Sequence, residues 1–209
     1  KITIRPAELI TDDGLITQQA VGSPVYFDYT LKGDAVELWQ PQFTYYGFRY
    51  IQVEGAVPEG VPNPQNLPVV AGLKSLHTRN AAATVGSFSC SNNLFNRTDT
   101  LINWAIKSNM ASVFTDCPHR EKLGWLEEVH LMGSSIKYNY DIASLCRKLV
   151  KDMINAQTKD GLVPDIAPEF VQFDGGFRDS PEWGSNSIIL PWYLYQWYGD
   201  RQVLEEAYP

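Results

Sequence analysis

The spacing of apolar residues changes once along this chain of 209 residues, and the change limits the folds open to it. Up to about residue 84 the apolar residues alternate or form short runs rich in β-branched and aromatic side chains, as in residues 25–31. From about Ser91 they recur at intervals of seven and four, as at Leu94, Leu101 and Ala105, which is the period of an α-helix. The sequence therefore predicts a β domain over residues 1–84 and a helical domain over residues 85–209.

The β part is typical of the end of a β-sandwich. Ile2 and Ile4 alternate with polar residues, and residues 48–53, rich in β-branched and aromatic side chains, follow the turn-like pair Tyr46-Gly47. Residues 57–64 hold three prolines, which neither a central strand nor a helix accommodates. We expect this stretch to be a surface loop.

The helical part contains three further amphipathic segments. Their ranges are 142–153 after the N-cap Asp141, 187–198 before Gly199, and 201–208 after the N-cap Asp200. Helices of this length joined by short or irregular loops pack as antiparallel hairpins. The pattern favours an array of α-hairpins over a doubly wound sheet.

Composition narrows the class of ligand. Seventeen Lys and Arg against 24 Asp and Glu give a net charge of −7 without a basic cluster, which argues against nucleic acid as a partner. The sequence has no run of about 18 apolar residues, so membrane insertion is not expected. Three cysteines without a CxxC pair indicate neither a disulfide framework nor a zinc knuckle. Aromatic residues make up 12% of the chain, more than a core needs, and sugars are one ligand class that uses such surface.

The densest polar segment, residues 115–130, is the first candidate site. If a helix starts at Pro118, then Glu121, Trp125 and Glu128 share one face, with the two carboxylates roughly 10 Å apart along the axis. That spacing is near the upper end used in inverting glycoside hydrolysis. Asp116, just before, is placed to hold a sugar hydroxyl or to shift the pKa of Glu121 through like charge.

Other interpretations of these residues stay open. The charged residues of the segment also fit an ordinary salt-bridged helix face with Trp125 as a core anchor. His119 and His130 lack the spacing of helical metal ligands, so we predict no metal site. A second polar and aromatic stretch, residues 161–184, is interpreted as a helix-free pocket wall, with a packed connector carrying Trp183 in the core as the alternative.

The segment DCPHREKLGWLEE at residues 116–128 resembles the acidic signature of bacterial α-L-rhamnosidases, glycoside hydrolase family 78, which commonly reads DCPQRDERLGWTGD. The resemblance extends to WQPQFTYYGFRY at 39–50, similar to the family's WxPxFTYxGFRY segment, and to GLVPDIAP at 161–168 and Trp183-Gly184. Four motifs in the same order are more specific than any one of them.

The resemblance implies an inverting exo-hydrolase of terminal α-L-rhamnose, with β-sandwich domains followed by an (α/α)6 barrel, or toroid, and with no cofactor. It implies that Glu121 is the general acid, that Asp116 binds the sugar, and that Trp125, Glu128 and Trp183 also contact the substrate. The expected partner is a carbohydrate, a rhamnoside. For a bacterial polysaccharide-degrading enzyme a periplasmic or extracellular location is expected.

The sequence departs from the family pattern at two positions, because Glu128 and Ser185 stand where many members carry aspartate. The family's general base is a glutamate much further along the barrel. We therefore expect an inactive fragment that holds the first part of the toroid and lacks the base, with terminal helix faces, including Ile188, Leu190 and Leu194, left without partners. The alternatives are a non-catalytic carbohydrate-binding module, and a toroidal glycosidase for another sugar, such as a uronic acid, for which a basic residue like Arg178 near the subsite is expected.

Overall fold

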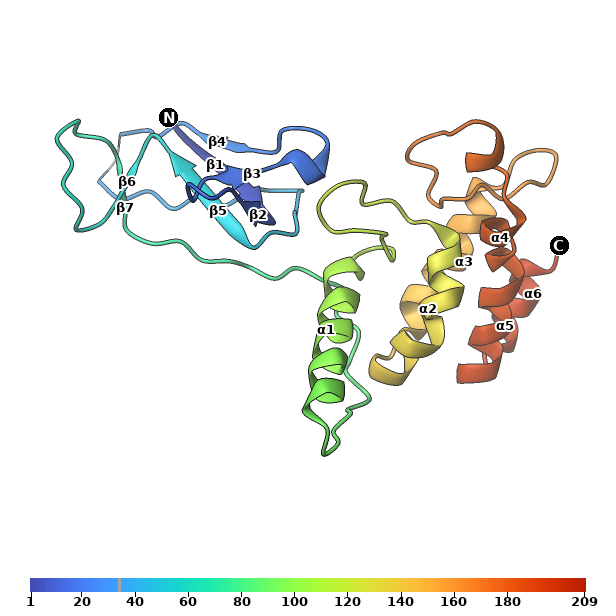
Figure 1. The fold of residues 1–209 in the computed structure, drawn as a ribbon. Helices are drawn as coiled ribbons and strands as arrows, with labels where there is room; N and C mark the ends of the chain where they lie inside the picture. Colours follow the sequence, from blue (N-terminus) through green and yellow to red (C-terminus); the bar gives the residue numbers. More distant parts are fainter. Residues whose placement is uncertain (34) are drawn as a thin grey trace. The chain divides into compact units, whose positions relative to one another are not determined.

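The computed structural model describes residues 1–33 and 35–209, and contacts divide the chain into two units. Unit 1 comprises Lys1–Thr78 with Pro118–Arg120, and unit 2 comprises Arg79–Cys117 with Glu121–Pro209. Figure 1 shows the strands of unit 1 in blue to cyan and the helices of unit 2 in green to red. The predicted order, β first and α second, is confirmed.

Unit 1 is built on a three-stranded antiparallel sheet of order β4-β1-β5 (Figure 1). Its strands are β1 (Ile2–Ala7), β4 (Phe27–Tyr29) and β5 (Tyr50–Glu54), and β2 (Leu9–Ile10) with β3 (Ile16–Thr17) form a small antiparallel pair. A 3-10 turn, η1, covers Gln19–Val21. The apolar side chain of Ile4 lies in register with Phe27 on one side and Val53 on the other, so cross-strand apolar pairs hold the sheet.

The proline-rich stretch is mostly turn, as predicted, but its first two residues form a strand. β6 (Val57–Pro58) pairs in parallel with β7 (Val69–Val70) in a two-stranded sheet. Pro58 is tolerated because each strand of a two-stranded sheet is an edge, where a proline without an N–H fits.

Unit 2 is helical. Its helices are α1 (Asn93–Asn109), α2 (Leu126–Asn139), α3 (Ala143–Ala156), the short α4 (Pro181–Gly184), α5 (Asn186–Tyr198) and α6 (Arg201–Ala207), with a 3-10 turn η2 (Gly175–Phe177). α5 packs against α2, α3 and α6, and these contacts form the core. Leu190 and Leu194 of α5 are fully buried there, with Leu126, Leu149 and Met153. None of the described helices has the length and apolar character of a membrane span.

Two of the three predicted helix caps in unit 2, Gly199 and Asp200, are confirmed, whereas the N-cap of α3 is Ile142 and not the predicted Asp141. Asn92 caps α1 by accepting a bond from the Leu94 N–H at 2.9 Å, and Asp200 caps α6 through the Val203 N–H at 3.2 Å. Gly199 ends α5 with φ of +68°, a conformation that glycine adopts without steric cost. The predicted helices over 142–153, 187–198 and 201–208 are confirmed to within three residues at their ends.

The prediction that a helix starts at Pro118 is wrong. α2 begins only at Leu126, so Glu121 and Trp125 precede it and the axial spacing of about 10 Å does not apply. Lys122 has φ of +55°, outside helical values, and residues 116–123 form a loop. The Asp116 N–H donates to the Leu123 carbonyl at 3.1 Å, and the Leu123 N–H donates to Asp116 Oδ1 at 3.0 Å, which closes that loop.

Two expectations about later segments are also corrected. Residues 161–184 are not helix-free, because η2 and α4 lie within them; Pro181 at the first position of α4 suits a helix start. Leu190 and Leu194 are not left without partners, since α2, α3 and α6 cover their side of α5. Ile188 is exposed, as predicted.

The apolar surface that does remain exposed in unit 2 is largest on α1. Leu94, Phe95, Leu101 and Trp104 are each more than half exposed. Exposed apolar patches of this kind are typical of surfaces that bind another protein surface.

We expect the 209-residue chain to self-associate through this face of α1. Replacing Leu94 and Leu101 together by Glu should shift the chain toward monomer with its helical circular dichroism retained, because charge on the face opposes its burial. Light scattering after size exclusion, over a range of concentrations, measures the effect. Gln65→Glu together with Gln202→Glu, at exposed polar positions outside α1, is the charge-matched control. A wild-type chain that stays monomeric at all concentrations contradicts the expectation.

Candidate functional site

Glu121 and Trp125 are joined by a hydrogen bond. The Trp125 indole Nε1–H donates to Glu121 Oε2 at 3.2 Å, with Glu121 on the exposed side of the loop. The Glu121 backbone N–H donates to Cys117 Sγ at 3.3 Å, which fixes the start of its side chain. The structure therefore places this carboxylate against an aromatic ring although the two residues do not share a helix.

Trp125 belongs to an aromatic cluster rather than to the core. Its ring stacks on Phe173 with centroids 5.4 Å apart and planes at 23°, and meets the edge of Trp183 at 6.2 Å and 66°. Phe173 in turn lies 6.4 Å from Phe177. Trp125 and Trp183 are both partly exposed. Trp183 packs against the hydrophobic core, as the connector interpretation expects, whereas Trp125 is not among the described residues of that core.

Glu128 lies in the first turn of α2 and is half buried. Its pKa is raised from the ordinary 4.5 to about 7, first by burial and then by the nearby negative charges of Asp116, Glu121 and Glu127, in that order. A helix N-terminus favours a carboxylate by only about 0.3–1 kcal/mol, less than one pKa unit, so it does not cancel the effect. At neutral pH a substantial fraction of Glu128 carries a proton.

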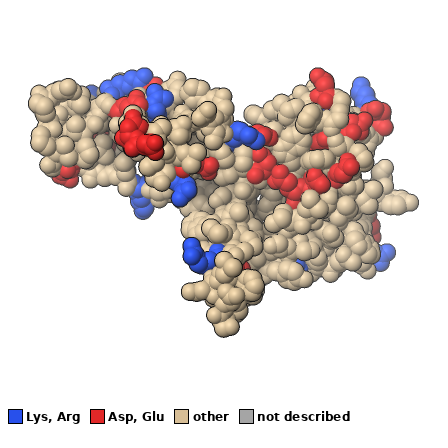
Figure 2. All heavy atoms as spheres, in the orientation of Figure 1, with Lys and Arg blue, Asp and Glu red and all other residues tan. Residues whose placement is uncertain are grey.

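All five site residues named from the sequence come together. Charge interactions join Asp116 and Glu121 to Glu128, a hydrogen bond joins Glu121 to Trp125, and ring contact joins Trp125 to Trp183. The negative charge of Asp116 was expected to shift the pKa of Glu121; in the structure it raises the pKa of Glu128. Asp116 Oδ1 also accepts a hydrogen bond from the Leu123 N–H, which closes the loop of residues 116–123. Figure 2 shows acidic side chains gathered over the upper half of the helical unit as drawn.

Residues 165–167 hold the residues at the start of α2 through backbone hydrogen bonds. The Leu126 N–H donates to the Asp165 carbonyl at 2.9 Å, and the Ala167 N–H donates to the Gly124 carbonyl at 3.2 Å, so Trp125 and Ile166 pair like strands. A Cβ on Gly124 would lie 2.9 Å from the Ala167 carbonyl oxygen, closer than real side chains allow. Only glycine permits this approach at residue 124.

Asp165 is a structural residue that the sequence analysis did not single out. Only 2% of its surface is exposed, and its Oδ1 accepts a hydrogen bond from the Ser180 N–H at 2.9 Å. Asp165 thereby ties both ends of residues 165–180, here called the aromatic loop, to the start of α2. The available signal was an acid directly after Pro164 in an otherwise apolar run, which indicates a buried partner.

Arg178 is held by Glu169 through two bonds, 2.6 Å from Nε and 3.1 Å from Nη2. A two-bond pair of this kind is among the stronger ionic contacts and compensates the guanidinium charge. The uronic-acid alternative relied on Arg178 to receive a substrate carboxylate. With Glu169 already bound there, that alternative loses its main support.

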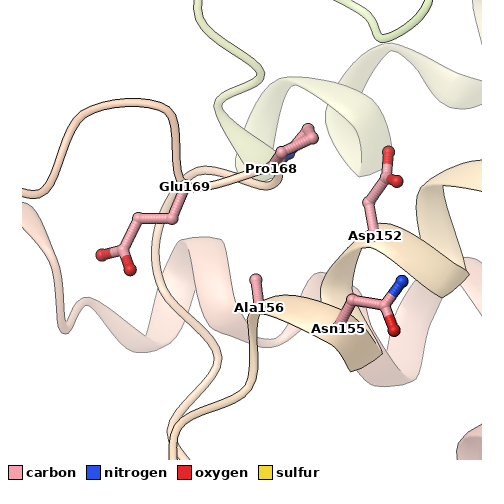
Figure 3. Close-up of a pocket in the computed structure, with 5 residues that line it drawn as sticks. All are labelled: Asp152, Asn155, Ala156, Pro168 and Glu169. Carbon is pink, nitrogen blue, oxygen red and sulfur yellow. The ribbon is translucent and has the colours of Figure 1, made fainter.

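A cavity of about 440 Å³ lies between α3 and the aromatic loop, but it does not hold the acidic cluster. Figure 3 shows its lining, and the Glu169 carboxylate points away from the α3 side chains. Those lining residues are Asp152, Asn155, Ala156, Pro168 and Glu169. Within residues 1–33 and 35–209, no group of three or more His, Cys, Asp or Glu is arranged to hold a metal ion.

Comparisons with known proteins point to one family. The model of the bacterial alpha-L-rhamnosidase 6 hairpin glycosidase domain matches residues 83–209, and that of the bacterial alpha-L-rhamnosidase concanavalin-like domain matches residues 1–72. A curated alpha-L-rhamnosidase from Streptomyces avermitilis is 35% identical over 210 residues, covering 100% of this chain and 19% of the relative.

Solved structures agree. The alpha-L-rhamnosidase from Dictyoglumus thermophilum matches with a TM-score of 0.84 at 35% identity, covering 99% of this chain and 22% of that one. The Streptomyces avermitilis alpha-L-rhamnosidase complexed with L-rhamnose matches with a TM-score of 0.80 at 33% identity, covering 99% and 19%. The chain thus spans about a fifth of the length of these relatives.

The raised pKa of Glu128 predicts a pH-dependent stability. A carboxyl whose pKa rises on folding contributes stability below its unfolded value, near 4.5, and that contribution is lost as the pH rises through about 7. Glu128→Gln, which stays neutral, should therefore raise the melting temperature by the order of a few °C at pH 8 and much less at pH 4. Thermal melts at both pH values measure this. Glu205→Gln, at an exposed site on α6, is the control, and an equal effect of Glu128→Gln at both pH values would refute the prediction.

Removing the buried carboxylate of Asp165 should destabilise the chain. Asp165→Ala leaves the Ser180 N–H without its acceptor, and we expect a loss of about 1–3 kcal/mol in the free energy of unfolding. Asp165→Asn keeps an oxygen acceptor and should lose less. Urea unfolding measures both, and equal losses for the two variants would show that the hydrogen bond is not the cause.

Proposed function

Because the chain belongs to the bacterial α-L-rhamnosidase family, we propose that it carries part of the active site of a glycosidase that releases terminal α-L-rhamnose. The observation that carries the proposal is the cluster of three carboxyl groups, Asp116, Glu121 and Glu128, beside the rings of Trp125 and Trp183. Carboxyl groups next to aromatic surface supply both acid chemistry and a stacking face for a sugar.

The proposed mechanism is a single displacement with inversion. Glu121 gives its proton to the glycosidic oxygen while a water attacks the anomeric carbon from the opposite face. Its exposed position lets it reach a leaving group, and the indole N–H on Oε2 sets the direction of the carboxyl. Asp116 and Glu128 bind the sugar, and a protonated Glu128 can donate a hydrogen bond to a hydroxyl.

Glu128 is the second candidate for the proton donor. It is the group of this cluster whose pKa is raised to about 7, and a general acid works best with a pKa near the working pH. Its half-buried position in the first turn of α2 gives it less reach than Glu121. We assign the acid role to Glu121 on the family position of the motif and on exposure.

We propose that the base that activates the water lies outside these 209 residues. The support is that the chain spans only about a fifth of its curated relatives. The toroid arrangement is proposed on the same ground, with further helical hairpins beside the five longer helices of unit 2. On this proposal the 209 residues alone bind sugar weakly and do not hydrolyse it.

A binding module without catalysis is the alternative from another class. Ser185, at a position where many members carry aspartate, donates its hydroxyl to the Glu182 carbonyl at 3.0 Å and carries no negative charge with which to bind a sugar hydroxyl. This alternative predicts L-rhamnose binding with no hydrolysis at the full length of the relatives.

The test measures hydrolysis of aryl α-L-rhamnosides by a longer protein, of the length of the curated relatives, that contains residues 1–209. Glu121→Gln keeps the shape and removes the proton donor, so hydrolysis of substrates with poor leaving groups should fall by about 10² to 10⁴-fold. Substrates with an activated phenol as leaving group should lose much less, since that group needs little protonation. Glu205→Gln is the matched control.

Each outcome assigns a role. A large loss for Glu128→Gln, with Glu121→Gln at wild-type rates on both substrates, transfers the acid role to Glu128. NMR of the first-formed rhamnose reports its anomer, and retention of configuration rules out the single displacement. L-Rhamnose binding without hydrolysis by the wild-type protein favours the binding module.

A further inference from the structure

Phe173 lies in the aromatic loop at a place that no motif marks. Its ring lies nearly parallel to the Trp125 indole, with centroids 5.4 Å apart and planes at 23°. Trp183 meets the same indole edge-on at 6.2 Å. The indole is therefore held from two directions, by one stacked ring and one ring edge.

The restrained indole is the hydrogen-bond donor to the carboxylate of the site. Trp125 Nε1 lies 3.2 Å from Glu121 Oε2, at the long end of the normal range. The terminal torsion of a tryptophan side chain has broad minima, so an unsupported indole would tilt easily. A small tilt at this distance removes the bond.

The loop that carries Phe173 is fixed at its base. Glu169 and Arg178 join its two sides through two bonds, and Asp165 Oδ1 holds the Ser180 N–H. Asp165 is in turn bonded through its carbonyl to the first residue of α2. The same residue, Asp165, therefore holds both the loop that carries Phe173 and the start of α2, and Trp125 immediately precedes that helix.

We propose that Phe173 is a positioning residue that holds the Trp125 indole with its N–H on the Glu121 carboxylate. What this does for catalysis rests on the proposed function: it sets the direction in which the Glu121 carboxyl faces the glycosidic oxygen. A flat ring is required for the role, because an aliphatic side chain fills the volume without defining the plane of the indole.

The direct test observes the indole N–H of Trp125 in the 209-residue chain labelled with ¹⁵N-tryptophan. The signal among the six tryptophans is identified by its loss in Trp125→Phe. Phe173→Leu should speed its exchange with solvent by about 2- to 10-fold, and Phe173→Tyr should leave it near the wild-type rate. Unchanged signals from the four indoles outside this cluster, Trp39, Trp104, Trp192 and Trp197, show that the chain is folded.

Phe170→Leu is the matched control, since Phe170 is on the same loop, is 86% exposed and should not alter the exchange rate. The proposal is overturned if Phe173→Leu leaves the Trp125 signal unchanged, or if Phe173→Tyr changes it as much as Phe173→Leu does.

The kinetic test uses the protein of the relatives' length. Phe173→Leu should lower kcat by about 2- to 10-fold with little change in KM, and Phe173→Tyr should restore it. In a Trp125→Phe background, which has no indole N–H, Phe173→Leu should have no further effect. Additive losses in the two backgrounds overturn the proposal.

The two tests separate the two proposals. If exchange responds as expected but the wild-type protein hydrolyses no rhamnoside, the positioning contact stands and the proposed function fails. If hydrolysis is found but exchange does not respond, the proposed function stands and Phe173 has no positioning role.

Discussion

The pairing of Trp125 with Ile166 is the interaction on which the candidate site depends. Two backbone hydrogen bonds, from Leu126 to Asp165 and from Ala167 to Gly124, hold the segment before α2 against the aromatic loop. They bring a loop far along the chain to the residues that carry the acids. Gly124 makes the approach possible, because any side chain there would meet the Ala167 carbonyl.

Crowding of negative charge follows from that arrangement. Asp116 is held by its own loop, Glu121 by an indole, and Glu128 by the first turn of α2, so none of them can move far from the others. A protein relieves such crowding by keeping a proton, and here burial selects Glu128 for it. The chain belongs to the bacterial α-L-rhamnosidase family, and one solved relative is complexed with L-rhamnose.

Prediction from the sequence succeeded where local chemistry decides the outcome. Gly199 ends α5 and Asp200 caps the start of α6 as expected, because a capping bond or a left-handed glycine needs only neighbouring residues. It failed at Pro118, where a sequence suited to a helix start becomes a loop. The reciprocal bonds between Asp116 and Leu123 compete with helical ones over that stretch, and no periodic pattern reveals them.

The sequence by itself determined the order of a β part and a helical part, most of the helix ends, the family and the five residues of the candidate site. Only the tertiary structure decided that Glu128 is the acid with the raised pKa, and that Asp165 and Phe173 support the site. The physical reason is the range of the interactions. Periodicity and capping act within a few residues, whereas desolvation, like-charge repulsion and ring stacking depend on groups that only folding brings together.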